Sequence, residues 1–218
     1  MRNIIKSLPI ENLQYLFEGR ESFLRKLKMD NVAVYSMTPL EESKRIAEII
    51  SSYVSKKGTI TDMTACVGGD TIRFSHVFKH INAIEISSER CQFLQHNVET
   101  YGCKNVSVFQ GNCLEMIHRL KQDVIYIDPP WGGKKYKYKK RVNLYLSTTP
   151  MWSICNNLQN LSKIIVLKVP LNFNEEFFVK KLIYDKEKVK RYVLEKMQLI
   201  IIRPLFLTLH ITFILSYT

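Results

Sequence analysis

Apolar and polar residues alternate along residues 59–170 with two different periods, which predicts strands and helices in turn. Short runs rich in β-branched and aromatic residues predict buried strands at 59–65, 81–86, 105–110, 123–130 and 162–170. Segments with helical spacing separate them, and the expected helices are roughly 69–79, 87–102, 113–120 and 149–161. This alternation is typical of βαβ units, which form an α/β fold with a parallel sheet and helices on both faces.

The segment before this pattern is predicted to be helical. Residues 1–35 are expected as an N-terminal helical extension with a helix around Asn12 to Leu27, ahead of one domain over residues 36–218. A further helix is expected from Pro39, with Thr38 as its N-cap, because threonine caps helices and proline is favoured at the first helical position.

The end of the chain, Leu199 to Thr218, is very apolar but is interrupted by Arg203 and Pro204. The 14 residues that follow are fewer than the roughly 20 that a membrane helix needs. Their aromatic and β-branched content predicts an edge or penultimate strand of the sheet, and we expect no membrane partner.

Composition narrows the class of protein further. The 218 residues, 46% hydrophobic and 24% charged, suit one compact globular domain and exclude disordered and disulfide-scaffold chains. A net charge of +12 favours a polyanionic partner, nucleic acid first. The five cysteines show no CxxC or zinc-ligand spacing, so no metal is expected. The N-terminus does not resemble a secretory signal, which favours an intracellular location, and nothing in the sequence calls for more than a monomer.

Several polar residues fall where strands end, and in a parallel sheet that edge holds the ligand. Asp62 lies late in the first strand, and a loop with Cys66 leads to the pair Gly68-Gly69 at the start of a helix. The glycines allow a ligand close to the backbone, although an ordinary turn would also use them. Glu85 ends the second strand, where a carboxylate can bind a ribose diol. Asn112 follows the third strand, where it can contact adenine or cap a helix.

The most specific motif is Asp128-Pro-Pro-Trp131-Gly-Gly at the end of the fourth strand. A nucleobase amine is a weak nucleophile, so an enzyme that methylates it must hold both of its N–H groups and fix the plane of the base. Asp128 and the rigid carbonyl of Pro129 can accept those hydrogens. Trp131 can stack on the base, a contact worth roughly 1–3 kcal/mol. A basic run from Lys134 to Arg141 follows and suits a phosphate grip.

These residues resemble the class I S-adenosylmethionine-dependent methyltransferases and, more narrowly, the RNA cap guanine-N2 methyltransferases of the trimethylguanosine synthase family. The resemblance covers roughly residues 36–170. It rests on SxTP at Ser36 to Pro39, D-x-x-x-C-x-G-G at Asp62 to Gly69, and PPWGG at Pro129 to Gly133.

The resemblance implies a Rossmann-like fold with a seven-stranded, mostly parallel sheet, S-adenosylmethionine as cofactor and a 7-methylguanosine-capped RNA as substrate. The expected catalytic residues are Asp128, Pro129 and Trp131. The expected cofactor-binding residues are Asp62, Cys66, Gly68, Glu85, Asn112 and Asp128. The expected substrate-binding residues are Trp131, Lys134, Lys135, Ser36 and Thr38. Such an enzyme would act in the nucleus or cytoplasm, or serve a virus in its host cell.

Two other functions stay open at this point. The cap family often carries serine where this chain has Asp128, and DPPW also occurs in N6-adenine methyltransferases, so adenine or cytosine in RNA or DNA is an alternative target. A non-catalytic cap- or RNA-binding module with the same fold is the second alternative.

Overall fold

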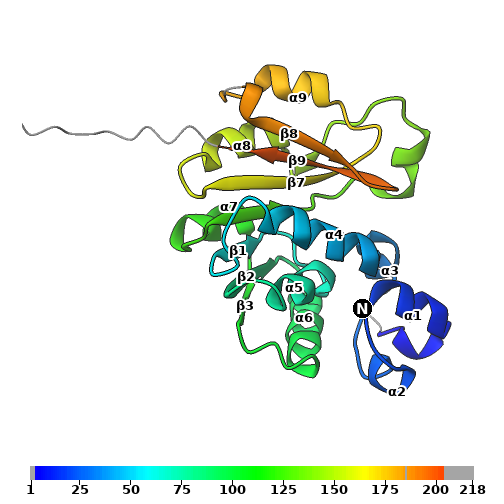
Figure 1. The fold of residues 1–218 in the computed structure, drawn as a ribbon. Coiled ribbons are helices and arrows are strands. Elements are labelled where there is room, and N and C mark those ends of the chain that lie inside the picture. The colour runs from blue at the N-terminus through cyan, green and yellow to red at the C-terminus, as the bar shows by residue number, and fades with distance from the viewer. Residues whose placement is uncertain (1–2, 185, 204–218) are drawn as a thin grey trace, which may run out of the picture.

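The computed structural model describes residues 3–184 and 186–203, and a seven-stranded sheet forms its centre (Figure 1). The strand order is β3-β2-β1-β4-β7-β9-β8. The strands are β1 Thr59–Asp62, β2 His80–Glu85, β3 Val106–Gln110, β4 Val124–Ile127, β7 Ile164–Pro170, β8 Val189–Val193 and β9 Met197–Ile202. The first five in this order run parallel and β9 is antiparallel to both of its neighbours. The predicted seven-stranded, mostly parallel sheet is confirmed.

Helices cover both faces of this sheet, as the alternation of the sequence predicts. One face carries α4 Leu40–Ser51, α5 Gly69–Ser75 and α6 Ser88–Thr100. The other carries α7 Cys113–Met116, α8 Met151–Leu158 and α9 Glu175–Lys181. After α4, the remaining elements are the 3-10 turns η2 Ile117–Arg119, η3 Gly133–Tyr138 and η4 Lys186–Lys188, and the short hairpin of β5 Tyr145–Leu146 and β6 Thr149–Pro150. None of the helices in the described part of the chain is both long and apolar enough to cross a bilayer.

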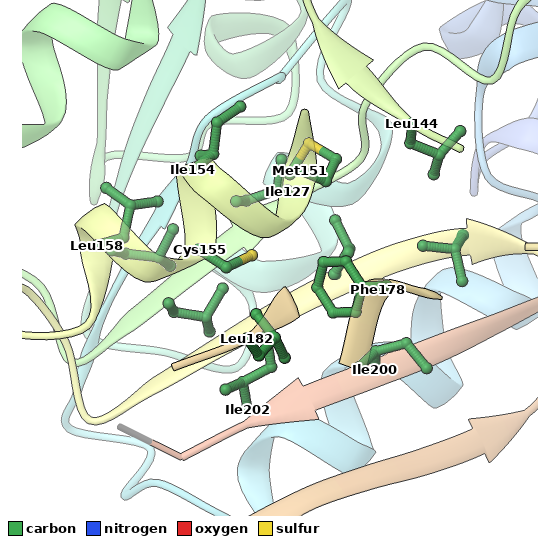
Figure 2. Packing of buried hydrophobic residues seen from close by; sticks show 14 of the residues in the cluster. Ile127, Leu144, Met151, Ile154, Cys155, Leu158, Phe178, Leu182, Ile200 and Ile202 are labelled. Carbon is green, nitrogen blue, oxygen red and sulfur yellow. The ribbon is translucent and has the colours of Figure 1, made fainter. Parts of the chain in front are cut away.

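The core forms because side chains of a strand point to opposite faces in turn. In β4, Ile125 and Ile127 pack under α8 and α9, whereas Val124 and Tyr126 pack under α4 and α5. Figure 2 shows the first of these layers, with Ile127 beside Met151 of α8 and with Ile200 and Ile202 of β9 in the same cluster. A strand buried on both faces is therefore mostly apolar, and this arrangement positions the strand ends that form the site.

The N-terminal extension differs from its prediction. The single helix expected around Asn12 to Leu27 is wrong: the chain forms α1 Ile10–Leu16 and α2 Glu21–Leu24, after the turn η1 Ile5–Ser7 and before α3 Asn31–Ser36. The break contains Phe17 in an extended conformation and Gly19 at φ +148°. Helical backbone cannot continue through such angles, so two short helices replace one long one.

The extension packs tightly against the rest of the fold. Its apolar residues, Ile5, Leu13 and Leu24 among them, share a core with residues of α6. The buried amide of Asn97 in α6 also donates to the carbonyl oxygen of Lys28 and accepts from the Lys28 amide, both at 2.8 Å. The division into an extension over 1–35 and a domain over 36–218 stays a prediction, since both parts share this core.

Two further expectations concern the start of α4 and the C-terminal strand. Thr38 is not the N-cap of α4: the helix begins at Leu40 with Pro39 in the cap position, and the Thr38 hydroxyl is bonded to Asp70 instead. Of the apolar C-terminal stretch, residues up to Ile202 form β9, the penultimate strand of the sheet. The part predicted as a strand over residues 205–218 lies outside the described residues.

Candidate functional site

A cavity of about 830 Å³ opens along the carboxyl ends of β1, β2, β4 and β7. These ends flank the boundary between β1 and β4, where the chain order of the sheet reverses and where α/β folds bind their ligands. Ten of the residues predicted from the sequence line it: Ser36, Thr38, Asp62, Cys66, Glu85, Asn112, Asp128, Pro129, Trp131 and Lys134. The other two, Gly68 and Lys135, are not among its lining residues.

Asp62 lies on the floor of this cavity and is only 1% exposed. Its carboxylate accepts hydrogen bonds from the Thr71 hydroxyl at 2.6 Å and the Thr64 amide at 3.2 Å. Burial, reinforced by the nearby carboxylates of Asp70 and Asp128, raises the pKa of Asp62 to about 7. A positively charged ligand beside Asp62 would relieve this repulsion.

The loop after Asp62 is shaped by two residues with positive φ. Gly68 has φ +100° and precedes α5, and a side-chain Cβ there would lie 2.9 Å from Leu94 Cδ1. Cys66 has φ +51°, and its amide donates to Glu85 Oε2 at 3.0 Å. Burial raises the pKa of the Cys66 thiol to about 12, so this sulfur is not a nucleophile at neutral pH. Gly68 is thus needed for its backbone conformation, and the Cys66 amide connects the loop to β2 through Glu85.

Glu85 is fixed at the end of β2 by its own hydrogen bonds. Besides the Cys66 amide, the Ser87 amide donates to its carboxylate at 2.8 Å, and Arg90 lies 3.8 Å away. Burial raises its pKa. A carboxylate held this rigidly and facing the cavity is a suitable acceptor for paired hydroxyl groups.

The side chain of Asn112 caps a helix, one of the two roles that the sequence left open. Its oxygen accepts from the Leu114 amide at 3.1 Å, as expected of an N-cap, and its nitrogen donates to Glu115 at 2.7 Å. Contact with adenine stays a prediction for this residue, which lines the cavity.

Asp128 and Trp131 follow the end of β4. The Asp128 amide donates to Thr64 Oγ1 at 2.8 Å, which fixes the strand end against the loop after β1. One fifth of the Asp128 side chain is exposed. Burial raises its pKa to about 6, although Lys168 opposes that shift. Trp131 is half-buried and packs edge-on against Tyr136, with ring centroids 5.2 Å apart at 85°.

Lys168 in β7 is a site residue that sequence reasoning missed. Its ammonium lies 2.6 Å from Asp128 Oδ2, donates to Thr38 Oγ1 at 2.6 Å and lies 3.9 Å from Asp70 Oδ2. Asp70 also accepts from the hydroxyls of Thr38 at 2.7 Å and Tyr126 at 2.8 Å. A charged residue inside the apolar run IIVLKVP was the signal that could have identified it, because a buried lysine needs a partner.

The mouth of the cavity is basic and aromatic. The Lys134 ammonium lies 5.2 Å above the ring of Tyr35, and that of Lys196 donates to the Tyr15 hydroxyl at 3.0 Å. Lys137 also lines the mouth. The predicted basic run begins as η3 and is held by the Asn172 side chain, which donates to two of its carbonyl oxygens at 2.9 and 2.7 Å. Such lysines suit an anionic ligand.

The cavity therefore has opposite charges at its two ends. Three carboxyl groups on the floor, those of Asp62, Asp70 and Asp128, face one ammonium, whereas lysines surround the mouth. Within residues 3–184 and 186–203, no group of three histidine, cysteine, aspartate or glutamate side chains is arranged to hold a metal ion. The arrangement favours a molecule with a positive part held deep and a negative part held outside.

Comparisons with solved structures agree with the fold. A protein of Porphyromonas gingivalis W83 solved as a candidate methyltransferase superposes with a TM-score of 0.68 at 16% identity, over 89% of this chain and 48% of that one. Precorrin-6y C5,15-methyltransferase from Geobacter metallireducens GS-15 superposes with a TM-score of 0.55 at 15% identity, over 77% and 89% of the two chains. These likenesses confirm the Rossmann-like class I fold.

Similar sequences come from a virus and from yeasts. Uncharacterized protein L320 of Acanthamoeba polyphaga mimivirus is 33% identical over 153 residues, 68% of this chain and 59% of that protein. Trimethylguanosine synthase of Schizosaccharomyces pombe is 29% identical over 51% of this chain and 48% of that protein. That of Saccharomyces cerevisiae is 23% identical over 78% and 58%. The chain matches between 48% and 59% of the length of these relatives.

A family model gives the most direct assignment. The model described as RNA cap guanine-N2 methyltransferase matches residues 57–200, which include β1 through most of β9 and every strand end that forms the cavity. Since this match spans well over half of the 218 residues, the chain belongs to the RNA cap guanine-N2 methyltransferase family.

Proposed function

We propose that this chain transfers a methyl group from S-adenosylmethionine to the exocyclic N2 amine of a 7-methylguanosine RNA cap, giving di- or trimethylguanosine. The observation that carries the proposal is the charge distribution of the cavity. A 7-methylguanosine cap joins a cationic base to a chain of phosphates, so it is positive at one end and negative at the other. The carboxylates of the floor and the lysines of the mouth complement these two ends.

The residues at the floor fit the cofactor as well. Asp62 and Asp70 can face its charged methionine end, and one buried oxygen of Asp70 has no hydrogen-bond partner among the described residues. Glu85 can accept from the ribose hydroxyls, as its fixed position supports. When bound, S-adenosylmethionine supplies the methyl group on a sulfonium, a cation that these carboxylates would attract.

At the substrate, the chain would position the amine. Trp131 would stack on the cationic base, and a cation over an indole face adds about 0.5–2 kcal/mol to stacking. Asp128 and the Pro129 carbonyl would accept the two amine hydrogens and hold the nitrogen toward the methyl group. As the nitrogen gains the methyl group it becomes positive, and Asp128 would stabilise that charge until a proton leaves.

Related proteins support the choice of base. The relatives from Schizosaccharomyces pombe and Saccharomyces cerevisiae are both named trimethylguanosine synthase. Because this chain matches only about half the length of these proteins, the whole activity, including the number of methyl groups added, belongs to the proposal.

The test offers the purified chain S-adenosylmethionine with 7-methylguanosine diphosphate or with guanosine diphosphate, and detects methylated product by mass. We expect product on the first compound alone. Trp131→Ala should raise the KM for it roughly 5- to 150-fold, the factor that corresponds to 1–3 kcal/mol of lost stacking. Trp152→Ala is the matched control, because Trp152 lies in α8, packs against the core from there and does not line the cavity.

Other outcomes would redirect the assignment. Equal methylation of both compounds would contradict recognition of the N7-methylated base. Product only on adenine-containing RNA or DNA would favour the alternative suggested by Asp128, an adenine methyltransferase. Failure to bind S-adenosylmethionine would leave a non-catalytic cap- or RNA-binding module.

A further inference from the structure

Lys168 is a charged residue in the most buried part of the sheet. It lies in β7, every residue of which is buried, and only 2% of its side chain is exposed. Burying an ammonium group is costly unless it is paired. Lys168 therefore needs negatively charged partners, and this site supplies them.

The pairing is centred on Asp128. Lys168 Nζ lies 2.6 Å from Asp128 Oδ2, a short distance typical of a charge-assisted hydrogen bond, and 5.6 Å from the centre of the Trp131 ring. The ammonium thus touches the carboxylate and the aromatic ring that the proposed function assigns to the substrate base.

Other ionisable groups face the pair from four elements: Asp62 from β1, Asp70 from α5, Tyr126 from β4 and Tyr136 from η3. Burial opposes the charge on Lys168, but Asp128 and then Asp70 outweigh it and raise its pKa. In the opposite direction, burial and Asp70 favour protonation of Asp128, and Lys168 opposes it. Lys168 is thus the cation that this cluster provides for Asp128.

We propose that Lys168 is a positioning residue for methyl transfer: it keeps Asp128 ionised and holds one of its oxygens, so that the other oxygen is free to accept a hydrogen from the substrate amine. This inference rests on the proposed function and adds to it a residue from a different strand. A protonated Asp128 would present a hydroxyl in place of an acceptor, and it would no longer stabilise the positive charge that develops on the amine.

The Lys168 ammonium also connects the segment that contains Thr38 with the start of α5. It donates to Thr38 Oγ1 at 2.6 Å, and the Thr38 hydroxyl donates to Asp70 at 2.7 Å. Thr38 belongs to the SxTP segment at the N-terminal side of the cavity, whereas Asp70 lies at the start of α5. The Lys168 ammonium is thereby fixed by Thr38 and Asp70 as well as by Asp128, and through it the Asp128 carboxylate is held in place.

The test compares the pH dependence of kcat for Lys168→Met and the parent, with 7-methylguanosine diphosphate at saturation. We expect the acidic limb, near pH 6 in the parent from the pKa of Asp128, to move up by at least about one pH unit in the variant. At pH 7 kcat should fall about twofold for a shift of one unit and about tenfold for a shift of two, and the loss should be largely recovered at pH 9. The KM should change less than about threefold, because Trp131 is intact.

Lys163→Met is the matched control. Lys163 precedes the same strand and pairs with Asp123 at 2.7 Å, but 66% of its side chain is exposed and it does not line the cavity. Its profile should superimpose on that of the parent. In an Asp128→Asn background, Lys168→Met should have no further effect on the limb, since an effect that acts through Asp128 disappears with it.

If Lys168→Met does not fold, Lys168→Met/Asp70→Asn removes one positive and one negative charge together and carries the same test. A folded variant whose kcat falls equally at all pH values would overturn the proposal, because that result indicates only a structural role. An unchanged profile would overturn it as well. If the parent itself does not methylate 7-methylguanosine diphosphate, the proposed function fails first, and the role of Lys168 fails with it.

Discussion

The variant Asp62→Asn should become more stable than the parent by a margin that grows as the pH rises above 5. In the folded protein burial raises the pKa of this carboxyl to about 7, whereas in the unfolded chain it is about 3.9. Between these two values the unfolded chain ionises freely and the folded protein resists ionisation. The parent therefore loses stability as the pH rises through this window, and a neutral asparagine does not.

The size of the effect follows from these two pKa values. Fully developed, about three pKa units correspond to about 4 kcal/mol. Between pH 5 and pH 8 the carboxyl of Asp62 should cost the parent about 2.5 kcal/mol of unfolding free energy by linkage. For a domain of this size that is roughly 5–10 °C in Tm. Any hydrogen bond from Thr71 that asparagine accepts less well adds an offset that does not depend on pH.

Urea unfolding of both proteins at pH 5, 6, 7 and 8 measures this directly. The difference between Asp62→Asn and the parent should grow by about 2.5 kcal/mol across the series. Asp123→Asn is the control: burial opposes the charge of Asp123, but the hydrogen bonds from Lys163 and the Thr59 amide, together with the charge of Lys163, outweigh it and lower the pKa. Asp123 is therefore ionised in both states above pH 5, and its difference should stay constant. A constant difference for Asp62→Asn would refute the reasoning.

Two further predictions concern the loop and the strand beside Asp62. Gly68→Ala should lower the unfolding free energy by about 1–3 kcal/mol, because φ is +100° and the new Cβ would lie 2.9 Å from Leu94 Cδ1; an unchanged urea midpoint would contradict this. Glu85→Gln should weaken S-adenosylmethionine binding about tenfold or more by calorimetry, since hydrogen bonds to charged groups contribute about 1.5–3 kcal/mol. The KM of Glu85→Gln for the cap analogue should stay the same. The control Glu99→Gln, on the exposed side of α6, should change neither the affinity for S-adenosylmethionine nor this KM. A loss confined to the affinity for the cap would contradict the assignment of Glu85 to the cofactor.

Much of the fold could be predicted from the sequence because its signals are local. The strands β1, β3, β4 and β7 lie within their predicted ranges and β2 begins one residue before its own, since a strand buried on both faces is a short apolar run whatever surrounds it. The helix α6 lies within its predicted range of 87–102 for the same reason: Ser87 caps its N-terminus and Gly102, at φ +67°, follows its C-cap, and such caps depend on the chain a few residues away.

The errors lie where contacts between distant segments decided the outcome. Thr38 has the side chain of a good N-cap, but its hydroxyl is bonded to Asp70 and Lys168, so α4 begins without it. The helix expected over 12–27 is divided by the turn that packs the extension against α6. The polar strand β8 has no apolar pattern of its own and is held by pairing with β9.

The sequence by itself determined which side chains meet at one edge of the sheet, because the carboxyl ends of parallel strands must lie together. Asp62, Glu85 and Asp128 follow from that rule alone. Only the tertiary structure decided the electrostatics of the site, since a pKa depends on burial and on distances between groups far apart in the chain. Asp128 and Lys168 are separated by 40 positions, yet they lie 2.6 Å apart because β4 and β7 are neighbours in the sheet.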